Sequence, residues 1–162
     1  MAGTFNGAGF VAVWTSPLVR ARETGEIVAA ALRLPPPSCH DGLKERHFGV
    51  IQGIPKSELA EMNPALLQQI QRRNPAADFE GGESMDAFAD RVLAAIAEIG
   101  ARHSGDRVLV ITHGWALDVI VRQVDSLPRS AILNIKRRNG ESLWLAVNPN
   151  EMMRLSSPDG TG

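Results

Sequence analysis

The chain has 162 residues, of which 44% are hydrophobic and 22% charged, a composition typical of one globular domain with its own core. Because 17 basic residues nearly balance 18 acidic ones, we expect no binding to nucleic acid or to an anionic membrane. Cys39 is the only cysteine, which excludes an intramolecular disulfide and a zinc site built on paired thiolates, and suits a reducing compartment.

The first part of the chain has the pattern of a strand, a turn and a helix. The opening MAGTFNGAGF has no basic segment and no long apolar run, so we expect no secretory signal, no membrane span and a cytoplasmic location. Phe10 to Thr15 is a short apolar run that predicts a buried strand. Ser16-Pro17 suits the N-cap and first turn of a helix that ends before the three prolines at 35–37. Residues 43–49 are too polar for a buried strand and indicate a short edge strand or a loop.

Further helices and strands alternate along the rest of the chain. Residues 57–73 form a weakly amphipathic pattern that predicts a surface helix interrupted near Pro64. A helix with a clean apolar face is predicted over residues 85–99. Val108 to Thr112 is almost purely apolar and β-branched, which predicts a strand buried on both faces, and a second helix follows it through Val124. Three closing strands, partly antiparallel, are predicted at Ile132 to Lys136, Leu143 to Val147 and Met152 to Leu155.

This order of elements predicts the fold class. Strands that alternate with helices favour an α/β domain of three layers, α/β/α, around a mostly parallel, mixed sheet. We expect a single domain over residues 1–155, followed by a disordered tail at 156–162.

Two residues of this pattern fall where open α/β sheets place their sites, beyond the carboxyl ends of the strands. Arg20 lies in the first turn of the first helix, and His113 lies at the tip of the strand from Val108. Both are suited to one anion, Arg20 as a fixed cationic fork and His113 as an anion ligand or a proton carrier. Each also has an ordinary structural interpretation, Arg20 as a surface charge and His113 as a polar turn residue. Glu45, between Lys44 and Arg46, suits either an exposed ion pair or a general acid.

Four segments taken together are more specific than any one of them. They are Trp14 to Thr24, Leu43 to Gly49 with Gln52-Gly53, Gly81 to Ser84, and Val110 to Gly114. In order and spacing they resemble the histidine phosphatase superfamily, also called phosphoglycerate mutase-like. The resemblance covers most of the chain, from about Phe10 to Val124, and implies the fold of that family.

The resemblance implies a role for each matched residue. Arg20 is then a phosphate-binding residue, Glu45 the acid that protonates the leaving oxygen, and His113 the second active-site histidine, which holds the phosphoryl group. The substrate side of the site is implied to include Arg46, His47, Glu83 and Gly114, with Glu83 in a supporting role. The family mechanism proceeds through a phosphohistidine and implies no metal or cofactor; the implied ligand is phosphate or a small phosphorylated metabolite.

The first motif of the family has no match in this sequence. Its nucleophile is a histidine in an Arg-His-Gly sequence at the end of a first strand, and the residues before Phe10 contain neither histidine nor arginine. Arg102-His103-Ser104-Gly105 is similar only superficially, because it ends a helix. We therefore expect the first strand to be missing and turnover by this polypeptide to be weak or absent.

The missing strand also has a structural consequence. In the family it lies beside the strand that carries His113, so its loss should expose a sheet edge. We expect a homodimer through that edge, strand exchange, a gap filled by Ile132 to Lys136, or poor solubility.

Two functions stay open. The first is a phosphomonoesterase whose amino-terminal motif is lost from this sequence, and the second is a noncatalytic phosphate- or phosphoester-binding module on the same fold. An unrelated nucleotide-binding domain has little support, because neither GxGxxG nor GxxxxGK[ST] occurs. The short stretch between Gly53 and Gly81 favours a phosphatase over a mutase, while substrate identity depends on the variable region Gln52 to Phe79.

Overall fold

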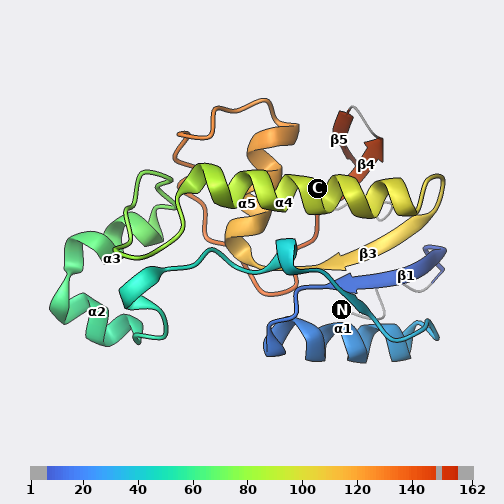
Figure 1. Ribbon diagram of the computed structural model, residues 1–162, viewed down its shortest axis with the longest axis horizontal. Helices are drawn as coiled ribbons and strands as arrows, with labels where there is room; N and C mark the ends of the chain where they lie inside the picture. Colours follow the sequence, from blue (N-terminus) through green and yellow to red (C-terminus); the bar gives the residue numbers. More distant parts are fainter. Residues whose placement is uncertain (1–6, 149–150, 157–162) are drawn as a thin grey trace.

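The computed structural model describes residues 7–148 and 151–156, and its central feature is a parallel sheet of three strands (Figure 1). The strands are β1 (Phe10–Thr15), β2 (Ser38–Cys39) and β3 (Arg107–Ile111), in the order β2-β1-β3. Both β2 and β3 run parallel to β1, with Trp14 opposite Ser38 on one side and Val110 on the other. The expected disordered tail lies, apart from Ser156, outside the described residues.

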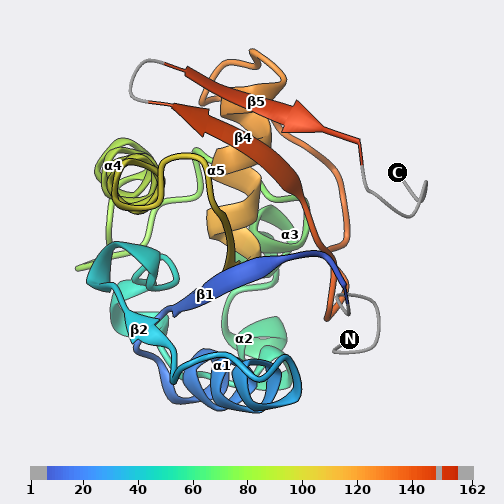
Figure 2. The same cartoon turned by 90° about the vertical axis from the view of Figure 1, so that its right-hand side faces the viewer.

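Helices lie on both faces of this sheet, as predicted (Figures 1 and 2). Helix α1 (Val19–Ala31) lies on one side, while α4 (Met85–Arg102) and α5 (Gly114–Val124) lie on the other. The core is apolar and forms mainly where α4 and α5 meet: Trp14, Leu43, Phe88, Ala89, Val92, Ala95, Ile96, Ile99, Trp115, Ala116, Val119 and Ile120. In the part of the chain that the structure describes, no helix is both long and apolar enough to cross a membrane.

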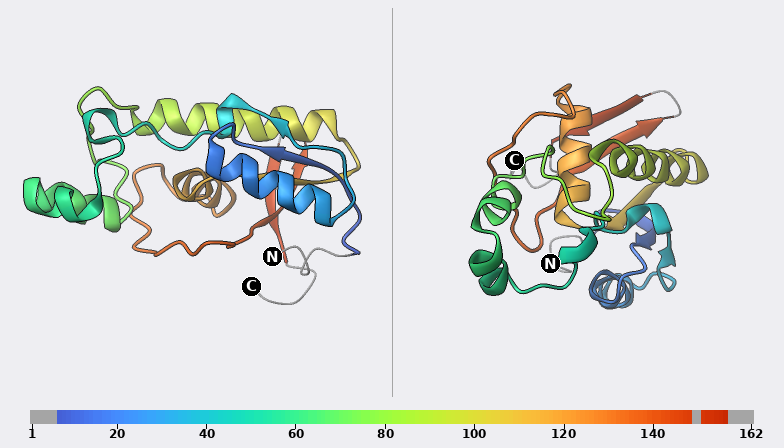
Figure 3. Two further views of the ribbon diagram at one scale, coloured as in Figure 1. Left: turned by 90° about the horizontal axis from the view of Figure 1, so that it is seen from below. Right: turned by 60° about the vertical axis from the view of Figure 1, so that its left-hand side comes forward.

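The interrupted surface helix is confirmed as two short helices. They are α2 (Lys56–Met62) and α3 (Pro64–Gln71), and Asn63 caps α3 by accepting a hydrogen bond from the Leu66 N–H at 2.9 Å. Both helices lie beyond the carboxyl ends of β1 and β3 (Figure 3). The connection before them contains two 3₁₀ turns, η2 (Asp41–Leu43) and η3 (Gly49–Ile51), so residues 43–49 form a loop.

The carboxyl-terminal strands form a separate hairpin. Strands β4 (Trp144–Asn148) and β5 (Glu151–Leu155) pair antiparallel, which confirms two of the three predicted strands. The third prediction is wrong, because Ile132 to Lys136 has no regular secondary structure. Buried side chains of α5 hold both ends of that segment: the Nε of Arg122 donates to the Ala131 carbonyl at 3.0 Å, and Asp118 accepts from Arg137 at 2.7 Å. The segment is thus held against α5 and does not extend a sheet.

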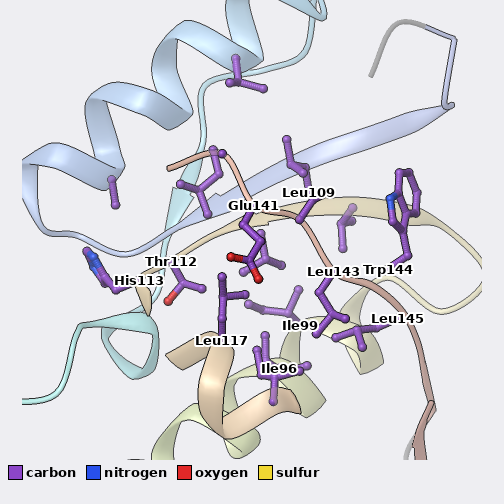
Figure 4. A pocket seen from close by; sticks show the side chains of 18 of the residues that line it. Ile96, Ile99, Leu109, Thr112, His113, Leu117, Glu141, Leu143, Trp144 and Leu145 are labelled. Atoms are coloured by element: carbon purple, nitrogen blue, oxygen red, sulfur yellow. The ribbon is translucent and has the colours of Figure 1, made fainter. Parts of the chain in front are cut away.

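A cavity of about 1040 Å³ lies between β3 and β4. Apolar side chains point into it in Figure 4, from α4, β3, α5 and the chain before and within β4: Ile96, Ile99, Leu109, Leu117, Leu143 and Leu145. Among the described residues β3 is an edge strand, so Val108 to Ile111 are only half-buried and not buried on both faces as predicted. Among the described residues, Ile132 to Lys136 does not pair with the free edge of β3, so that expected rearrangement is wrong.

Candidate functional site

Ser16 and His113 meet where β1 and β3 end. Helix α1 begins at Val19, with Leu18 as its N-cap, so Ser16 is not the capping residue that the sequence suggested. Its hydroxyl lies instead 2.8 Å from the Nε2 of His113, and both residues are buried. His113 is itself the N-cap residue of α5. The carboxyl ends of two neighbouring parallel strands thus fix the orientation of one imidazole.

The His113 ring is uncharged at neutral pH. Burial lowers its pKa to about 4, and the positive charges of Arg20 and Arg91 act in the same direction. Only 7% of the residue is exposed. An anion placed between Arg20 and His113 would counteract these effects and favour the imidazolium, so anion binding here is coupled to proton uptake.

This lowered pKa gives a stability prediction. The unfolded chain takes up the His113 proton near pH 6.5 and the folded chain only near pH 4. The free energy of unfolding therefore decreases as the pH falls through that window. We expect His113 to contribute a loss of about 3 kcal/mol between pH 7 and pH 4, measured by urea denaturation. His113→Asn should remove this component. Burial raises the pKa of Glu45 and gives the opposite slope, but both proteins retain Glu45. Equal losses in the two proteins would contradict the assignment.

Glu45 lies at the amino end of α5, next to His113. Its Oε1 accepts from the Arg46 N–H at 3.1 Å and its Oε2 from the Trp115 N–H at 3.4 Å. Burial raises the pKa of this carboxyl, although these two bonds and the charges of Arg73 and Arg20 oppose the shift. A carboxyl group held in this way and inclined to keep its proton is suited to be a proton donor.

Arg91 fixes the loop that carries Glu45. Its guanidinium donates to the carbonyl oxygens of Gly42, Lys44 and Glu45 at 2.9 to 3.1 Å. It also forms a bidentate ion pair with Glu83, with Nε 2.7 Å from Oε1 and Nη2 2.8 Å from Oε2. The structure therefore places Glu83 behind the site, where it orients Arg91. Arg91 was not predicted as a site residue. Its only local signal is that a charged residue stands three positions after the buried Phe88, on the core side of α4.

Arg46 and His47 do not lie at the mouth of the site as expected. Arg46 is 3% exposed, and its guanidinium donates to the Glu83 and Ala77 carbonyls at 3.0 and 3.1 Å. It lies over the ring of Phe79, 4.6 Å from the centroid. His47 is exposed and its Nδ1 accepts from the Gly49 N–H at 3.2 Å. Neither residue lines the cavity, so this geometry supports a structural role for Arg46.

The cavity brings the other expected residues together. Arg20, Glu45, His113 and Gly114 all line it. Arg73 joins them unexpectedly: a Cβ added to Gly114 would lie 2.9 Å from its Nη2, so the glycine permits the guanidinium to approach. No local pattern marks Arg73, which follows α3 with a φ of 55°. The described residues hold no group of three or more His, Cys, Asp or Glu side chains arranged for a metal ion.

Comparison with known proteins identifies the family. The family model described as "Histidine phosphatase superfamily (branch 1)" matches residues 1–156. The chain belongs to the histidine phosphatase superfamily. The resemblance inferred from four ordered motifs is therefore confirmed over nearly the whole chain.

Relatives within the histidine phosphatase superfamily include phosphatases and mutase-like proteins. The chain is 34% identical over 153 residues to the metal-independent phosphoserine phosphatase of Arabidopsis thaliana, covering 91% of this chain and 64% of that protein. It is 36% identical over 106 residues to phosphoglycerate mutase-like protein 4 of the same plant, covering 65% of this chain and 46% of that protein. The chain thus spans less than two thirds of the length of these relatives.

A solved structure confirms the superfamily fold. YhfR of Bacillus stearothermophilus superposes with a TM-score of 0.82 at 26% sequence identity. The superposition covers 94% of this chain and 76% of the YhfR chain. The parallel sheet with helices on both faces is thus the phosphoglycerate mutase-like arrangement.

Proposed function

We propose that the chain binds the phosphate group of a small phosphorylated metabolite between Arg20 and His113. The family reaction is hydrolysis or transfer of that group through a phosphohistidine, with Glu45 as the proton donor. The observation that carries the proposal is that the guanidinium of Arg20, the uncharged buried imidazole of His113 and the carboxyl of Glu45, whose pKa is raised, all line one cavity.

Each group has a distinct part in this chemistry. The guanidinium of Arg20 stays charged and stabilises the non-bridging phosphoryl oxygens. His113, oriented by the Ser16 hydroxyl, takes up a proton as the anion binds and then donates a hydrogen bond to it. Glu45 gives its proton to the leaving alkoxide, which would otherwise depart as a strong base.

We propose that none of the other histidines of this sequence takes the part of the attacking histidine. His40 contacts Glu98 at 3.2 Å and does not line the cavity, and neither does the exposed His47. His103 lines the cavity, but it accepts from the Trp14 indole at 2.9 Å and precedes the amino end of β3, whereas His113 follows the carboxyl end. We therefore propose that this polypeptide by itself turns over phosphomonoesters feebly. The same observation supports the second candidate, a noncatalytic phosphoester-binding module.

Hydrolysis is favoured over mutase chemistry within this proposal. Residues 53–81 form only the short helices α2 and α3, without a larger insert over the site. The phosphoserine phosphatase among the relatives supports the same choice. A second copy of the chain is proposed as a partner at the edges of β3 and β4, and light scattering that shows only a monomer would exclude it.

Phosphate binding tests the proposal directly. Titration calorimetry with inorganic phosphate should show proton uptake on binding at pH 5.5, where phosphate is already a monoanion, because the bound anion favours protonated His113. Arg20→Ala should weaken the affinity about 10- to 100-fold, through loss of a charge-assisted hydrogen bond. Arg22→Ala is the matched control, since that residue is exposed on the same helix and pairs with Glu26. Equal affinities of Arg20→Ala and the unsubstituted protein would contradict the site. Robust phosphomonoester turnover abolished by His113→Ala would instead contradict the weak activity.

A further inference from the structure

The segment between α5 and β4 contains an exposed asparagine that is followed by glycine. Asn139 and Gly140 are the central residues of a tight turn, which the Glu141 N–H closes by donating to the Arg138 carbonyl oxygen at 3.3 Å. Gly140 has a φ of 81°, in the left-handed region that glycine adopts without strain. Both central residues are exposed, so the fold presents this Asn-Gly pair to solvent.

The two groups of this pair that can react with each other are held by no hydrogen bond. They are the side-chain amide of Asn139 and the backbone N–H of Gly140, and neither has a partner within residues 7–148 and 151–156. The ends of the turn are held instead. The Oε2 of Glu141 accepts from the Arg138 N–H at 3.2 Å, and Glu141 also pairs with Arg137. The reactive groups can therefore approach each other while the ends of the turn stay in place.

The other described asparagines are followed by residues that hinder the same reaction. Three of them precede proline, which has no backbone N–H: Asn63, Asn74 and Asn148. Asn134 precedes the β-branched Ile135, and its Oδ1 accepts from the Nε of Arg72 at 3.5 Å. A second Asn-Gly pair of the sequence begins at Asn6, which lies outside the described residues. Among the described asparagines, Asn139 is thus the one whose next residue leaves its side chain accessible to attack.

We propose that Asn139 is a modification site, at which the folded protein loses a neutral amide and gains an acidic group. The backbone nitrogen of Gly140 loses its proton and attacks the Cγ of Asn139, so that a C–N bond forms as ammonia leaves. Water then opens the cyclic imide at either of its two carbonyl groups, which gives aspartate or isoaspartate at position 139. Water is the only co-reactant. The inference does not rest on the proposed function.

The product alters a turn that is connected to a buried carboxylate. The formal net charge of the chain, −1 before the reaction, becomes one unit more negative. Isoaspartate also adds one carbon atom to the backbone between Arg138 and Glu141, whose two hydrogen bonds close the turn. Glu141 pairs with Arg137, and Arg137 pairs with the fully buried Asp118 at 2.7 Å. We therefore expect the modified turn to hold Arg137 less firmly on Asp118, with a loss of stability.

Peptide mapping of the incubated protein tests the site. The full chain is incubated at pH 8, either folded or unfolded in urea, and tandem mass spectrometry measures the loss of amide at each asparagine. We expect position 139 of the folded protein to convert within about threefold of its rate in the unfolded chain, because the fold holds neither reactive group. Asn134 should keep its amide over the same period. An isoaspartate methyltransferase should label the converted protein.

Variants assign the reaction to this pair of residues. Asn139→Gln should abolish the conversion at position 139, because glutamine would have to close a larger ring. Gly140→Ala should slow the conversion at least about fivefold, since a Cβ hinders the approach of the backbone nitrogen. Asn134→Gln is the matched control and should leave the rate at position 139 unchanged. After incubation the unsubstituted protein should unfold at a lower urea concentration than fresh protein, whereas incubated Asn139→Gln should keep its midpoint.

The outcomes decide each part of the inference. Conversion in urea without conversion in the folded protein would show that the fold protects Asn139, and the proposal would be refuted. A rate that Gly140→Ala leaves unchanged would refute attack by the Gly140 nitrogen. An unchanged urea midpoint after complete conversion would refute the loosening of Arg137. The map separates the peptide that contains Asn6, so conversion there does not enter the rate at position 139. None of these results depends on phosphate binding, so they are distinguishable from a failure of the proposed function.

Discussion

Fusing a strand that ends in Arg-His-Gly, with its following helix, ahead of Phe10 should raise phosphomonoester turnover by at least about 10³-fold. The reason is that covalent attack on phosphorus needs a nucleophile, whereas the groups already present only bind and stabilise charge. The cavity has room for such a strand, because β3 and β4 border it and apolar side chains line it. A strand parallel to β3 would bring its carboxyl end to His113.

The controls for this fusion keep the strand and change one group at a time. The same fusion with alanine in place of its histidine should fold equally well and remain near the activity of the present chain. His113→Ala in the active fusion should lower turnover by about 10²-fold or more, through loss of a transition-state hydrogen bond. Rapid quenching at alkaline pH should trap a phosphohistidine, which is acid-labile, only when the added histidine is present. A folded fusion without increased turnover would contradict the enzymatic proposal and favour the noncatalytic phosphoester-binding module.

Asp118→Ala should lower the free energy of unfolding by about 3 to 5 kcal/mol, the largest stability effect that we expect from a single charge. Asp118 is fully buried, and its removal leaves the guanidinium groups of Arg73 and Arg137 without the carboxylate with which both form ion pairs. The buried Arg122 also loses its nearby counter-charge. Urea denaturation at pH 7 measures the change.

An exposed ion pair supplies the comparison for this prediction. Asp90 pairs with Arg129 at 2.6 Å on the surface, where a lost ion pair costs only about 0 to 1 kcal/mol. Asp90→Ala should therefore change stability little. If Asp118→Ala and Asp90→Ala have similar effects, Asp118 does not hold the arginine cluster. Joint replacement of Asp118 by Leu and Arg137 by Met should cost less than the sum of the two single changes, because no charge of that pair is left unpaired.

Local sequence signals were enough to predict the alternating strands and helices and to identify the family. Apolar residues at helical spacing predict α4 and α5 because helices bury one face, and the β-branched runs predict β1 and β3. Four motifs in the right order identified the superfamily that the comparison confirms. The same motifs proposed Arg20, Glu45 and His113, since each lies directly after a strand or within a recognisable segment.

Tertiary packing decided the rest of the site. Arg91 donates to the carbonyl oxygens of Gly42 and Lys44, which lie 49 and 47 residues before it in the sequence. Nothing near Arg91 in the sequence marks those carbonyls as its partners. The apolar pattern of Ile132 to Lys136 suggested a strand, but anchoring to α5 outweighs a weak local preference.

By itself, the sequence determined the family, the layered α/β arrangement and the three residues proposed to handle phosphate. Only the tertiary structure decided that Ser16 orients His113, that Arg46 is buried, and that Arg73 and Arg137 converge on Asp118. The physical reason is the range of each interaction. Hydrophobic periodicity acts between neighbours along one element, whereas a buried charge is paired with whichever group the completed fold brings beside it.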